Sequence, residues 1–190
     1  MTSTAPLAAL REELHGLLAD RSFRFGDFVL SSGRRSDFYF DGKQVTLEGR
    51  GLFLVSSLLL ARCRELGATS VGGLTLGADP IAAGVAALSG ADDIAPLRAF
   101  IVRKEAKQHG TGRTIEGPPL TRDDRCMLVD DVVTTGAAFV TARDRVVETG
   151  AAVLEAAVVV DRQEGGREAL AEQGIALFAL FGRDEFRRPG

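Results

Sequence analysis

The sequence predicts an α/β protein in which a central parallel sheet is flanked by helices, and two observations support this fold class. First, short apolar runs typical of strands covered on both faces alternate along the chain with segments of helical periodicity. Second, the apolar runs 126–129 and 153–160 enclose a polar turn and a helical pattern that Gly150 ends. Such a strand–helix–strand unit places two strands in parallel, joined by a right-handed crossover.

The bulk composition is typical of one soluble domain. With 190 residues the chain is long enough to bury a sizeable core, and 45% hydrophobic and 26% charged residues are ordinary for such a protein. The formal net charge of −3 argues against a nucleic-acid-binding surface. Every apolar run is too short to span a membrane. We therefore expect a single domain over residues 1–190, with neither nucleic acid nor a membrane as its partner.

The cysteines and the N-terminal residues indicate in which cellular compartment the protein acts. Cys63 and Cys126 both lie in apolar segments, which favours buried thiols in a reducing cytosol over a disulfide. The first residues, MTSTAPLAALREEL, have neither a basic start nor an apolar stretch before a cleavage site, so we expect no signal peptide. Both observations favour a cytoplasmic protein.

The N-terminal third is predicted to hold two helices and a hairpin. Leucines at helical spacing predict an amphipathic helix over residues 6–19. Aromatic residues on both sides of the polar turn 31–36 predict a hairpin or paired strands within residues 23–41. Residues 51–66 form a strongly apolar helical segment that Gly67 ends. The aromatic rings either pack in the core or cover a site and offer a flat face to a bound base; residue types leave both interpretations open.

The middle of the chain is predicted to contribute two strands with a helix between them. Apolar residues predict strands at 71–76 and 96–102. Asp79 is a candidate N-cap and Pro80 fits the first helical position, so the helix is expected to run to about Ser89.

Two further stretches flank the central unit. Residues 103–122 have little apolar periodicity and several glycines and prolines, and loops of this length are commonly mobile lids. Their cations gather at the first end of the loop, where they are either solvated or able to neutralise an anionic leaving group. Beyond the unit, a helix is predicted at 167–173 and a final strand at 175–181.

The polar turn of the central unit carries the candidate chemistry. Asp130 and Asp131 follow the expected end of the strand, and the small residues 134–137 lead into the next helix. Unpaired N–H groups at a helix N-terminus, together with the positive end of its dipole, suit a phosphate. Beside a phosphate, two acids would face ribose hydroxyls or a magnesium ion that bridges to them, unless they merely cap a solvated turn. The stretch therefore points to a sugar phosphate with free hydroxyls.

The succession of a hydrophobic strand, Asp-Asp and Thr-Thr-Gly in residues 126–136 resembles the 5-phosphoribosyl 1-diphosphate (PRPP) signature of type I phosphoribosyltransferases. Further stretches narrow the resemblance to the orotate phosphoribosyltransferase family. Residues 25–40 are similar to its N-terminal hood, and RKEAKQHG at 103–110 is similar to its catalytic loop. With Asp-Arg-Gln-Glu at 161–164, the motifs occur in the family's order over roughly residues 22–181.

The resemblance implies a type I phosphoribosyltransferase fold with a small hood at about residues 20–45 and a mobile catalytic loop at about 103–122. It implies transfer of the phosphoribosyl group from PRPP to orotate, giving orotidine 5′-monophosphate and pyrophosphate in de novo pyrimidine biosynthesis. Mg²⁺ would be held mainly by PRPP, without a dedicated protein metal site. In this family the loop closes over the neighbouring subunit's site, which implies a homodimer with shared lids.

The resemblance also assigns roles to individual residues. The catalytic residues would be Lys104, Asp131 and His109. PRPP would be bound by Arg103, Lys104, Lys107, His109, Asp130, Asp131, Val132, Val133, Thr134, Thr135, Gly136, Ala137 and Ala138. Orotate would be bound by Thr134, Arg162, Tyr39 and Phe40. The Arg162 guanidinium would grip the carboxylate of orotate, and a surface ion pair with Asp161 or Glu164 is the alternative.

The chain departs from the family pattern at two cations. Many bacterial members carry Lys where this chain has Ser31, and some orotate enzymes have Tyr-Lys where it has Leu76-Gly77. Arg34 or Arg35 is a candidate substitute for the first of these. Two other functions remain as alternatives. A phosphoribosyltransferase for another nucleobase would share the acids and the phosphate turn, whereas a non-catalytic PRPP-sensing regulator would need a nucleic-acid surface.

Overall fold

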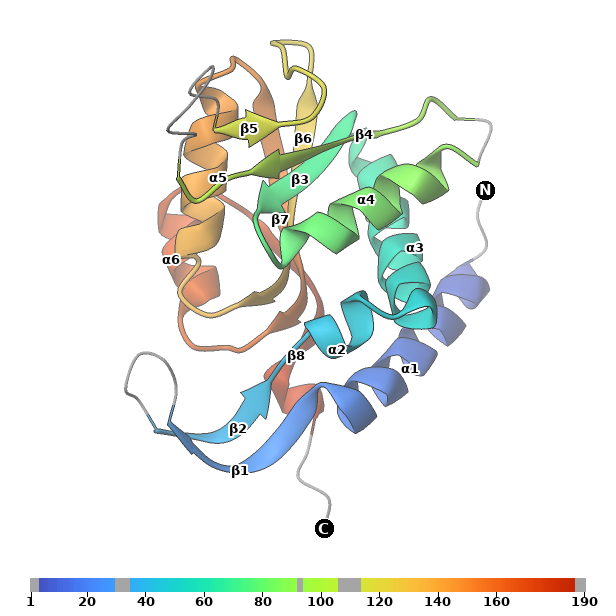
Figure 1. Cartoon of the computed structure of the whole chain (residues 1–190), viewed down its shortest axis with the longest axis vertical. Helices are drawn as coiled ribbons and strands as arrows, with labels where there is room; N and C mark the ends of the chain where they lie inside the picture. Colours follow the sequence, from blue (N-terminus) through green and yellow to red (C-terminus); the bar gives the residue numbers. More distant parts are fainter. Residues whose placement is uncertain (1–3, 30–34, 92–93, 106–113, 187–190) are drawn as a thin grey trace.

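A six-stranded sheet forms the centre of the computed structural model, which describes residues 4–29, 35–91, 94–105 and 114–186 (Figure 1). Its strand order is β5-β4-β3-β6-β7-β8. The strands are β3 (Ser70–Leu74), β4 (Arg98–Val102), β5 (Ile115–Glu116), β6 (Arg125–Val133), β7 (Ala152–Asp161) and β8 (Leu177–Gly182). Neighbours pair in parallel except at the β5 edge, where β5 runs antiparallel to β4. The predicted fold class is therefore confirmed.

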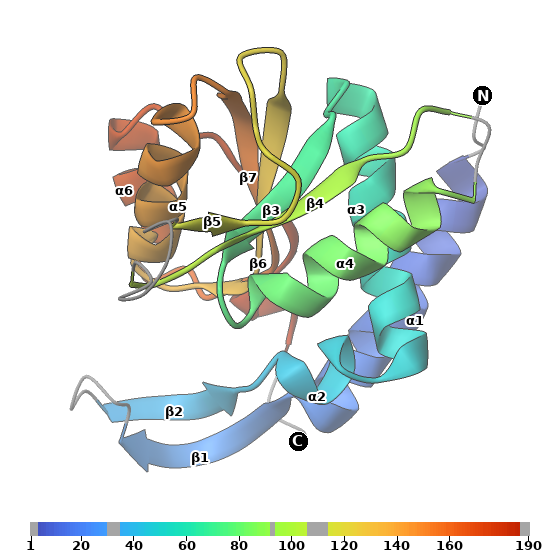
Figure 2. The same ribbon diagram turned by 45° about the horizontal axis from the view of Figure 1, so that its top comes forward.

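Helices cover both faces of this sheet (Figures 1 and 2). On one side lie α1 (Thr4–Arg21), α3 (Gly49–Leu66) and α4 (Ala78–Ser89), and on the other lie α5 (Ala137–Val147) and α6 (Gly166–Glu172). Side chains of β6 alternate between the two cores, with Met127 and Val129 in the first and Cys126 and Leu128 in the second. An unbroken apolar run is what a strand buried on both faces requires. None of the described helices is long and apolar enough to cross a membrane.

The predicted N-terminal hairpin stands apart from the sheet as a small hood. Its strands β1 (Phe23–Val29) and β2 (Arg35–Phe40) pair antiparallel. Phe23 packs against Phe186 with ring centroids 4.1 Å apart, so the hood is anchored to the segment after β8. A four-residue helix, α2 (Lys43–Thr46), links the hood to α3. The two views place the hood beside the edge at which the parallel strands end (Figures 1 and 2).

The structure corrects the predicted end of the central strand. The sequence pattern ends this strand at Val129, because two adjacent carboxylates are unusual in a buried strand, but β6 continues to Val133. The reason is its partner β7, since pairing between the two strands persists as far as Val133 and Asp161. Both acids therefore belong to the strand rather than to the turn after it.

Part of the segment expected to be a long loop also forms a strand. Within residues 103–122, β5 pairs with Ile101 and Val102 at the end of β4. Two residues are too few to leave a periodic signal in the sequence. Residues 106–113, which contain most of the predicted lid, lie outside the described part of the chain.

The start of α4 differs from the prediction that Asp79 is its N-cap. The helix begins at Ala78 after Gly77, and no side chain caps it. The Asp79 carboxylate instead accepts a hydrogen bond from the Thr75 hydroxyl, with 2.6 Å between Oγ1 and Oδ2. Asp79 thus ties the first turn of the helix to the preceding loop, and its charge lies where the helix dipole favours it.

The two thiols are free and buried, as predicted. Cys63 in α3 and Cys126 in β6 are both 0% exposed and form no disulfide. Burial disfavours the thiolate, and it raises the pKa of each thiol to about 12. Both side chains therefore serve as small apolar core residues.

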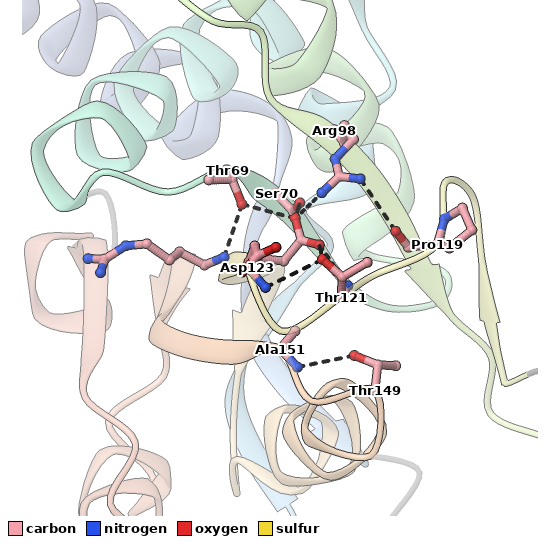
Figure 3. A network of polar contacts seen from close by, with 10 residues as sticks. Thr69, Ser70, Arg98, Pro119, Thr121, Asp123, Thr149 and Ala151 are labelled. Atoms are coloured by element: carbon pink, nitrogen blue, oxygen red, sulfur yellow. Dashed lines mark hydrogen bonds and ion pairs between the residues drawn. The ribbon is translucent and has the colours of Figure 1, made fainter.

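A polar network around a buried aspartate joins three strands at their amino ends. Figure 3 labels its partners Ser70, Arg98 and Thr121. Asp124 is 1% exposed and accepts hydrogen bonds from the hydroxyls of Ser70 at 2.9 Å and Thr69 at 3.1 Å. The backbone N–H of Thr121, at 2.7 Å, and the guanidinium of Arg98 also donate to it. Burial opposes the charge, but these hydrogen bonds outweigh it and lower the pKa of Asp124 to about 2. The network fastens β3, β4 and β6 at the edge opposite their carboxyl ends.

Replacing Asp124 with asparagine is expected to lower the free energy of unfolding by about 2 kcal/mol, because Arg98 loses its buried partner. For a chain of this size the melting temperature should fall by about 4–8 °C. The stabilisation by Asp124 is present above the pKa of an unfolded aspartate, about 3.9, and is lost as the pH falls toward 2. Thermal unfolding should therefore show a smaller difference in melting temperature between the native chain and Asp124→Asn at pH 3 than at pH 7.

The exposed neighbour Asp123 provides the matched control for this prediction. Asp123→Asn removes the same charge one residue away and should leave the melting temperature within about 1 °C of the native value. Equal effects of the two substitutions at pH 7 would contradict a special role for the buried network.

Candidate active site

An acid pair lies at the carboxyl edge of the sheet, enclosed by two backbone segments that lack side chains. Asp131 is 6% exposed, and the Asp131 N–H donates to Asp130 Oδ1 at 2.9 Å. Gly77, before α4, packs so closely that a Cβ there would lie 2.2 Å from Asp130 Oδ1. Gly42, before α2, would place a Cβ 2.8 Å from Asp131 Oδ2. A side chain at either position would collide with the carboxylates, so glycine allows both segments to pack on the acid pair.

The electrostatics of the pair favour a ligand that brings hydrogen-bond donors or positive charge. Burial and then repulsion from Asp131 raise the pKa of Asp130 to about 8. Burial also raises the pKa of Asp131, although the ammonium of Lys43 opposes this shift. Two carboxylates in one buried site hold a proton between them until a partner such as a hydroxyl-rich sugar offers donors.

The turn after β6 leads through a glycine into the uncapped N-terminus of α5. Gly136 has a φ of +80°, and a Cβ there would also meet Leu170 at 2.8 Å, so a glycine is needed for both reasons. Helix α5 begins at Ala137 without a side-chain cap. Among the hydrogen bonds between described residues, the backbone N–H groups of residues 135–138 donate none. Unpaired amides at the N-terminus of an eleven-residue helix suit a phosphate, and the binding of one here stays a prediction.

Arg162 stands directly after β7, at the predicted edge. It is 7% exposed, and its Nε donates to Glu164 Oε1 at 2.8 Å. Its guanidinium carbon lies 4.5 Å from the centroid of the Phe38 ring, in a cation–π contact. The ion pair with Glu164 that the sequence left as an alternative therefore exists. Asp161 pairs instead with Arg167, at 3.1 Å. The contact of Arg162 with orotate stays a prediction.

The predicted aromatic pair of the hood divides between two environments. Tyr39 and Phe40 are neighbours on β2 and so point to opposite faces. Phe40 is 7% exposed and packs on Phe23 with ring centroids 4.9 Å apart, whereas Tyr39 is 43% exposed. The two rings therefore point to opposite faces of β2, and their contacts with orotate stay a prediction. The ring beside Arg162 is that of Phe38, which strand alternation counted from Phe40 could have indicated.

A cleft of about 460 Å³ lies at the carboxyl end of β3 and β4. Its walls are Thr75, Asp79, Ile101, Arg103, Lys104, Glu105 and Glu116. Arg103 Nη1 lies 3.4 Å from Glu116 Oε1, and the side chain of Lys104 is exposed. The same walls carry the carboxylates of Asp79, Glu105 and Glu116, so the two cations do not by themselves make the cleft positive. Lys107 and His109 fall outside the described residues, so their predicted roles are untested.

The structure thus brings most of the described site residues to one edge of the sheet. Val132 and Val133 end β6, Thr134, Thr135 and Gly136 form the turn, and Ala137 and Ala138 open α5. Lys43 is an addition that sequence reasoning missed. Its Nζ lies 2.7 Å from Asp41 Oδ1 and 3.9 Å from Asp131 Oδ2. No sequence signal identifies it, because it reaches the acids only through the folding of the hood onto the sheet.

Comparisons of the sequence and of the structure with known proteins point to the same family. Residues 72–172 match the sequence model of the phosphoribosyl transferase domain. The orotate phosphoribosyltransferase of Thermosynechococcus vestitus is 48% identical over an alignment of 178 residues, which covers 92% of this chain and 92% of that one. A crystal structure of orotate phosphoribosyltransferase from Mycobacterium tuberculosis H37Rv is similar with a TM-score of 0.80 and 38% identity, covering 93% of this chain and 98% of that one. The same enzyme in complex with PRPP is similar with a TM-score of 0.76 and 34% identity, over the same shares of the two chains.

Proposed function

The chain belongs to the orotate phosphoribosyltransferase family, and we propose that it transfers the 5-phosphoribosyl group from PRPP to orotate. The products are orotidine 5′-monophosphate and pyrophosphate, a step of de novo pyrimidine biosynthesis. The observation that carries this proposal is the buried acid pair of β6 beside the uncapped N-terminus of α5. Together these groups suit a ribose with free hydroxyls and a 5′-phosphate.

The proposed reaction is a displacement at the anomeric carbon of the ribose. A ring nitrogen of orotate forms the new bond while the bond to pyrophosphate breaks, and the ribosyl centre gains oxocarbenium character. Asp130 and Asp131 accept hydrogen bonds from the ribose hydroxyls and lie near this positive charge. The turn 134–138 holds the 5′-phosphate and so fixes the anomeric carbon relative to both acids.

Cationic side chains are assigned to the leaving pyrophosphate and to the incoming orotate. Lys104 and Arg103, at the mouth of the cleft beside β4, neutralise the pyrophosphate as its charge grows. Nε and Nη2 of Arg162 both lie 2.8 Å from Glu164 Oε1, so Nη1 is the nitrogen that it offers to the carboxylate of orotate. The rings of the hood lie against the base. Lys107 and His109 complete the neutralisation when the loop closes.

Magnesium is proposed to enter with the substrate. No cluster of three or more His, Cys, Asp or Glu that could hold a metal ion is found in the parts of the chain that the structure describes. In this proposal the ion is carried by the pyrophosphate and hydroxyl oxygens of PRPP. When bound, magnesium supplies charge neutralisation of the leaving group. Residues of the chain position PRPP around it.

We also propose that the protein acts in the cytoplasm as a homodimer whose loops cross to the partner site. Buried free thiols fit a reducing compartment. Light scattering should give about twice the chain mass of 20.2 kDa.

The test of the activity is consumption of orotate by purified protein with PRPP and magnesium, beside uracil, adenine, hypoxanthine and guanine. We expect turnover of orotate alone, because only orotate carries the carboxylate that Arg162 can grip. Turnover of another base would keep the transferase chemistry and contradict the assignment of Arg162. Binding of PRPP without turnover of any base would favour a PRPP sensor instead.

A further inference from the structure

Lys43 occupies a position that the proposed function does not yet explain. It lies in α2, directly after the hood, and its ammonium reaches toward the acid pair on β6. Among the described residues it is the only cation that forms an ion pair with Asp131, with 3.9 Å between Nζ and Oδ2. A buried carboxylate needs such compensation, because an isolated charge in a protein interior is costly.

The ammonium of Lys43 is held in place by Asp41. Its Nζ lies 2.7 Å from Asp41 Oδ1, which also accepts the backbone N–H of Lys43 at 3.2 Å. The other oxygen, Asp41 Oδ2, accepts from the side chain of Gln44 at 3.1 Å. A long lysine side chain that would otherwise sample many rotamers is therefore fixed at its charged end.

The backbone sets the distance between this ammonium and the sheet. Gly42 packs directly on Asp131, since a Cβ at position 42 would lie 2.8 Å from both the Cβ and Oδ2 of Asp131. The residues on either side of Gly42 are Asp41 and Lys43, so their charged groups are placed next to Asp131 by the same contact. The hood is thus joined to the reaction centre by a defined chain of charges rather than by packing alone.

The charges that face Asp131 are unbalanced without Lys43. Asp41 after β2 is negative, and its charge raises the pKa of Asp131, whereas Gly77 before α4 contributes only backbone. Asp130, whose own pKa is raised to about 8, opposes this rise through its hydrogen bond with Asp131. Tyr39 on β2 and the two aspartates Asp41 and Asp131 all favour the charged form of Lys43. The hydrogen bond that its ammonium donates to Asp41 is the largest contribution to its raised pKa. At 3.9 Å the ammonium attracts the Asp131 carboxylate and still leaves its oxygens available to a ligand.

We propose that Lys43 is a positioning residue of the transfer site, whose ammonium keeps the Asp131 carboxylate ionised and oriented toward the bound ribose. This inference rests on the proposed function, because it assigns Asp131 to the ribose. A neutral Asp131 would donate a hydrogen bond instead of accepting one and would not stabilise the developing positive charge. Lys43 acts through Asp131 and makes no contact with the reacting atoms.

The kinetic test compares Lys43→Met, which removes the charge and keeps the length, with Lys43→Arg, which keeps the charge. The dependence of kcat/KM for PRPP on pH is measured at saturating orotate. Lys43→Met should move the acidic limb of the profile upward by about one pH unit, the effect of losing an opposite charge at this distance. It should also lower kcat/KM about tenfold at pH 7, whereas KM for orotate changes less than twofold.

Lys43→Arg should keep the acidic limb of the kcat/KM profile within a few tenths of a pH unit of its native position. Arg145→Met, on the far end of α5, removes a cation of similar exposure and should match the native profile. An unmoved limb in Lys43→Met, or an equal shift in Arg145→Met, would overturn the proposal.

A second measurement keeps this inference separate from the proposed activity. The carboxyl ¹³C resonance of Asp131, assigned by its loss in Asp131→Asn, is titrated in the free protein without substrate. Its pKa should rise in Lys43→Met and not in Lys43→Arg. An unchanged pKa would refute the role of Lys43 even in an active enzyme. Failure of the native protein to use orotate would refute the proposed function and leave the titration to decide on Lys43.

Discussion

Lys104→Ala is expected to lower kcat by about two to three orders of magnitude while the dissociation constant of PRPP changes less than threefold. The charge on the departing pyrophosphate grows as its bond to the ribose breaks, so a cation that meets it contributes mainly in the transition state. Lys104 lies at the mouth of the cleft beside β4 with an exposed side chain, free to approach such a group. Steady-state kinetics give kcat, and calorimetric titration with PRPP and magnesium gives the dissociation constant.

The exposed Arg122, in the loop at the amino edge of the sheet, provides the control cation. Arg122→Ala removes the same charge and should leave kcat unchanged. The assignment of Lys104 would fail if its variant bound PRPP much more weakly and turned over at the native rate, because that result describes ground-state binding.

Lys104→Ala also tests whether the catalytic loop acts in the active site of the neighbouring subunit. Mixed dimers of Lys104→Ala and Asp131→Asn chains contain one intact site if loops cross, since one subunit then supplies the loop and the other the acids. An equimolar mixture forms half of its dimers as heterodimers and should regain about a quarter of the native activity. Heterodimers confirmed by mass spectrometry that remain inactive would show that each loop serves its own subunit.

Asp130→Asn is expected to raise the melting temperature of the free protein by about 4 °C at pH 9 and to lower kcat at least a hundredfold. Burial and repulsion from Asp131 raise the pKa of Asp130 to about 8, above the value of about 3.9 in an unfolded chain. Stability contributed by the protonated form is therefore fully present below about pH 4 and lost as the pH rises through 8. Asparagine removes the charge that causes this loss.

Thermal unfolding from pH 5 to pH 9, with and without PRPP, measures the effect. The difference between Asp130→Asn and the native chain should widen as the pH rises, and PRPP with magnesium should stabilise the native chain more than the variant. Asp144→Asn, at an exposed carboxylate of α5, should track the native protein throughout. A gap in melting temperature that is constant across this pH range would contradict the shifted titration of Asp130.

Periodicity predicted the sheet and most of its helices because each is built from residues that repeat at 2 or 3.6 positions. The errors in the predicted elements occur where contacts with other segments decide the structure more than the local sequence pattern does. β6 runs on to Val133 through two acids because β7 continues to pair with it and because Gly42 and Gly77 leave room for the carboxylates. The two-residue β5 and the four-residue α2 are too short to show any period.

The candidate site likewise has a part that the sequence predicts and a part that depends on contacts between distant segments. The acid pair and the phosphate turn are contiguous in the chain, so their chemistry could be read directly from residues 130–138. The groups around them come from distant segments. Phe38 beside Arg162, and Lys43 beside Asp131, meet their partners only because the hood folds against the carboxyl edge. Strand alternation on β2 was a usable signal for the first, whereas nothing in the sequence indicated the second.

The burial of both native thiols makes the unaltered chain a suitable background for site-specific labelling. Cys63 and Cys126 are fully enclosed and their pKa values are raised to about 12, so they react slowly with maleimides or spin-label reagents. A cysteine introduced at an exposed position such as Glu105 should therefore be modified selectively without first removing the native ones. Paired with a second label on the hood, it would report the approach of the two segments during turnover by spin–spin distance or energy transfer.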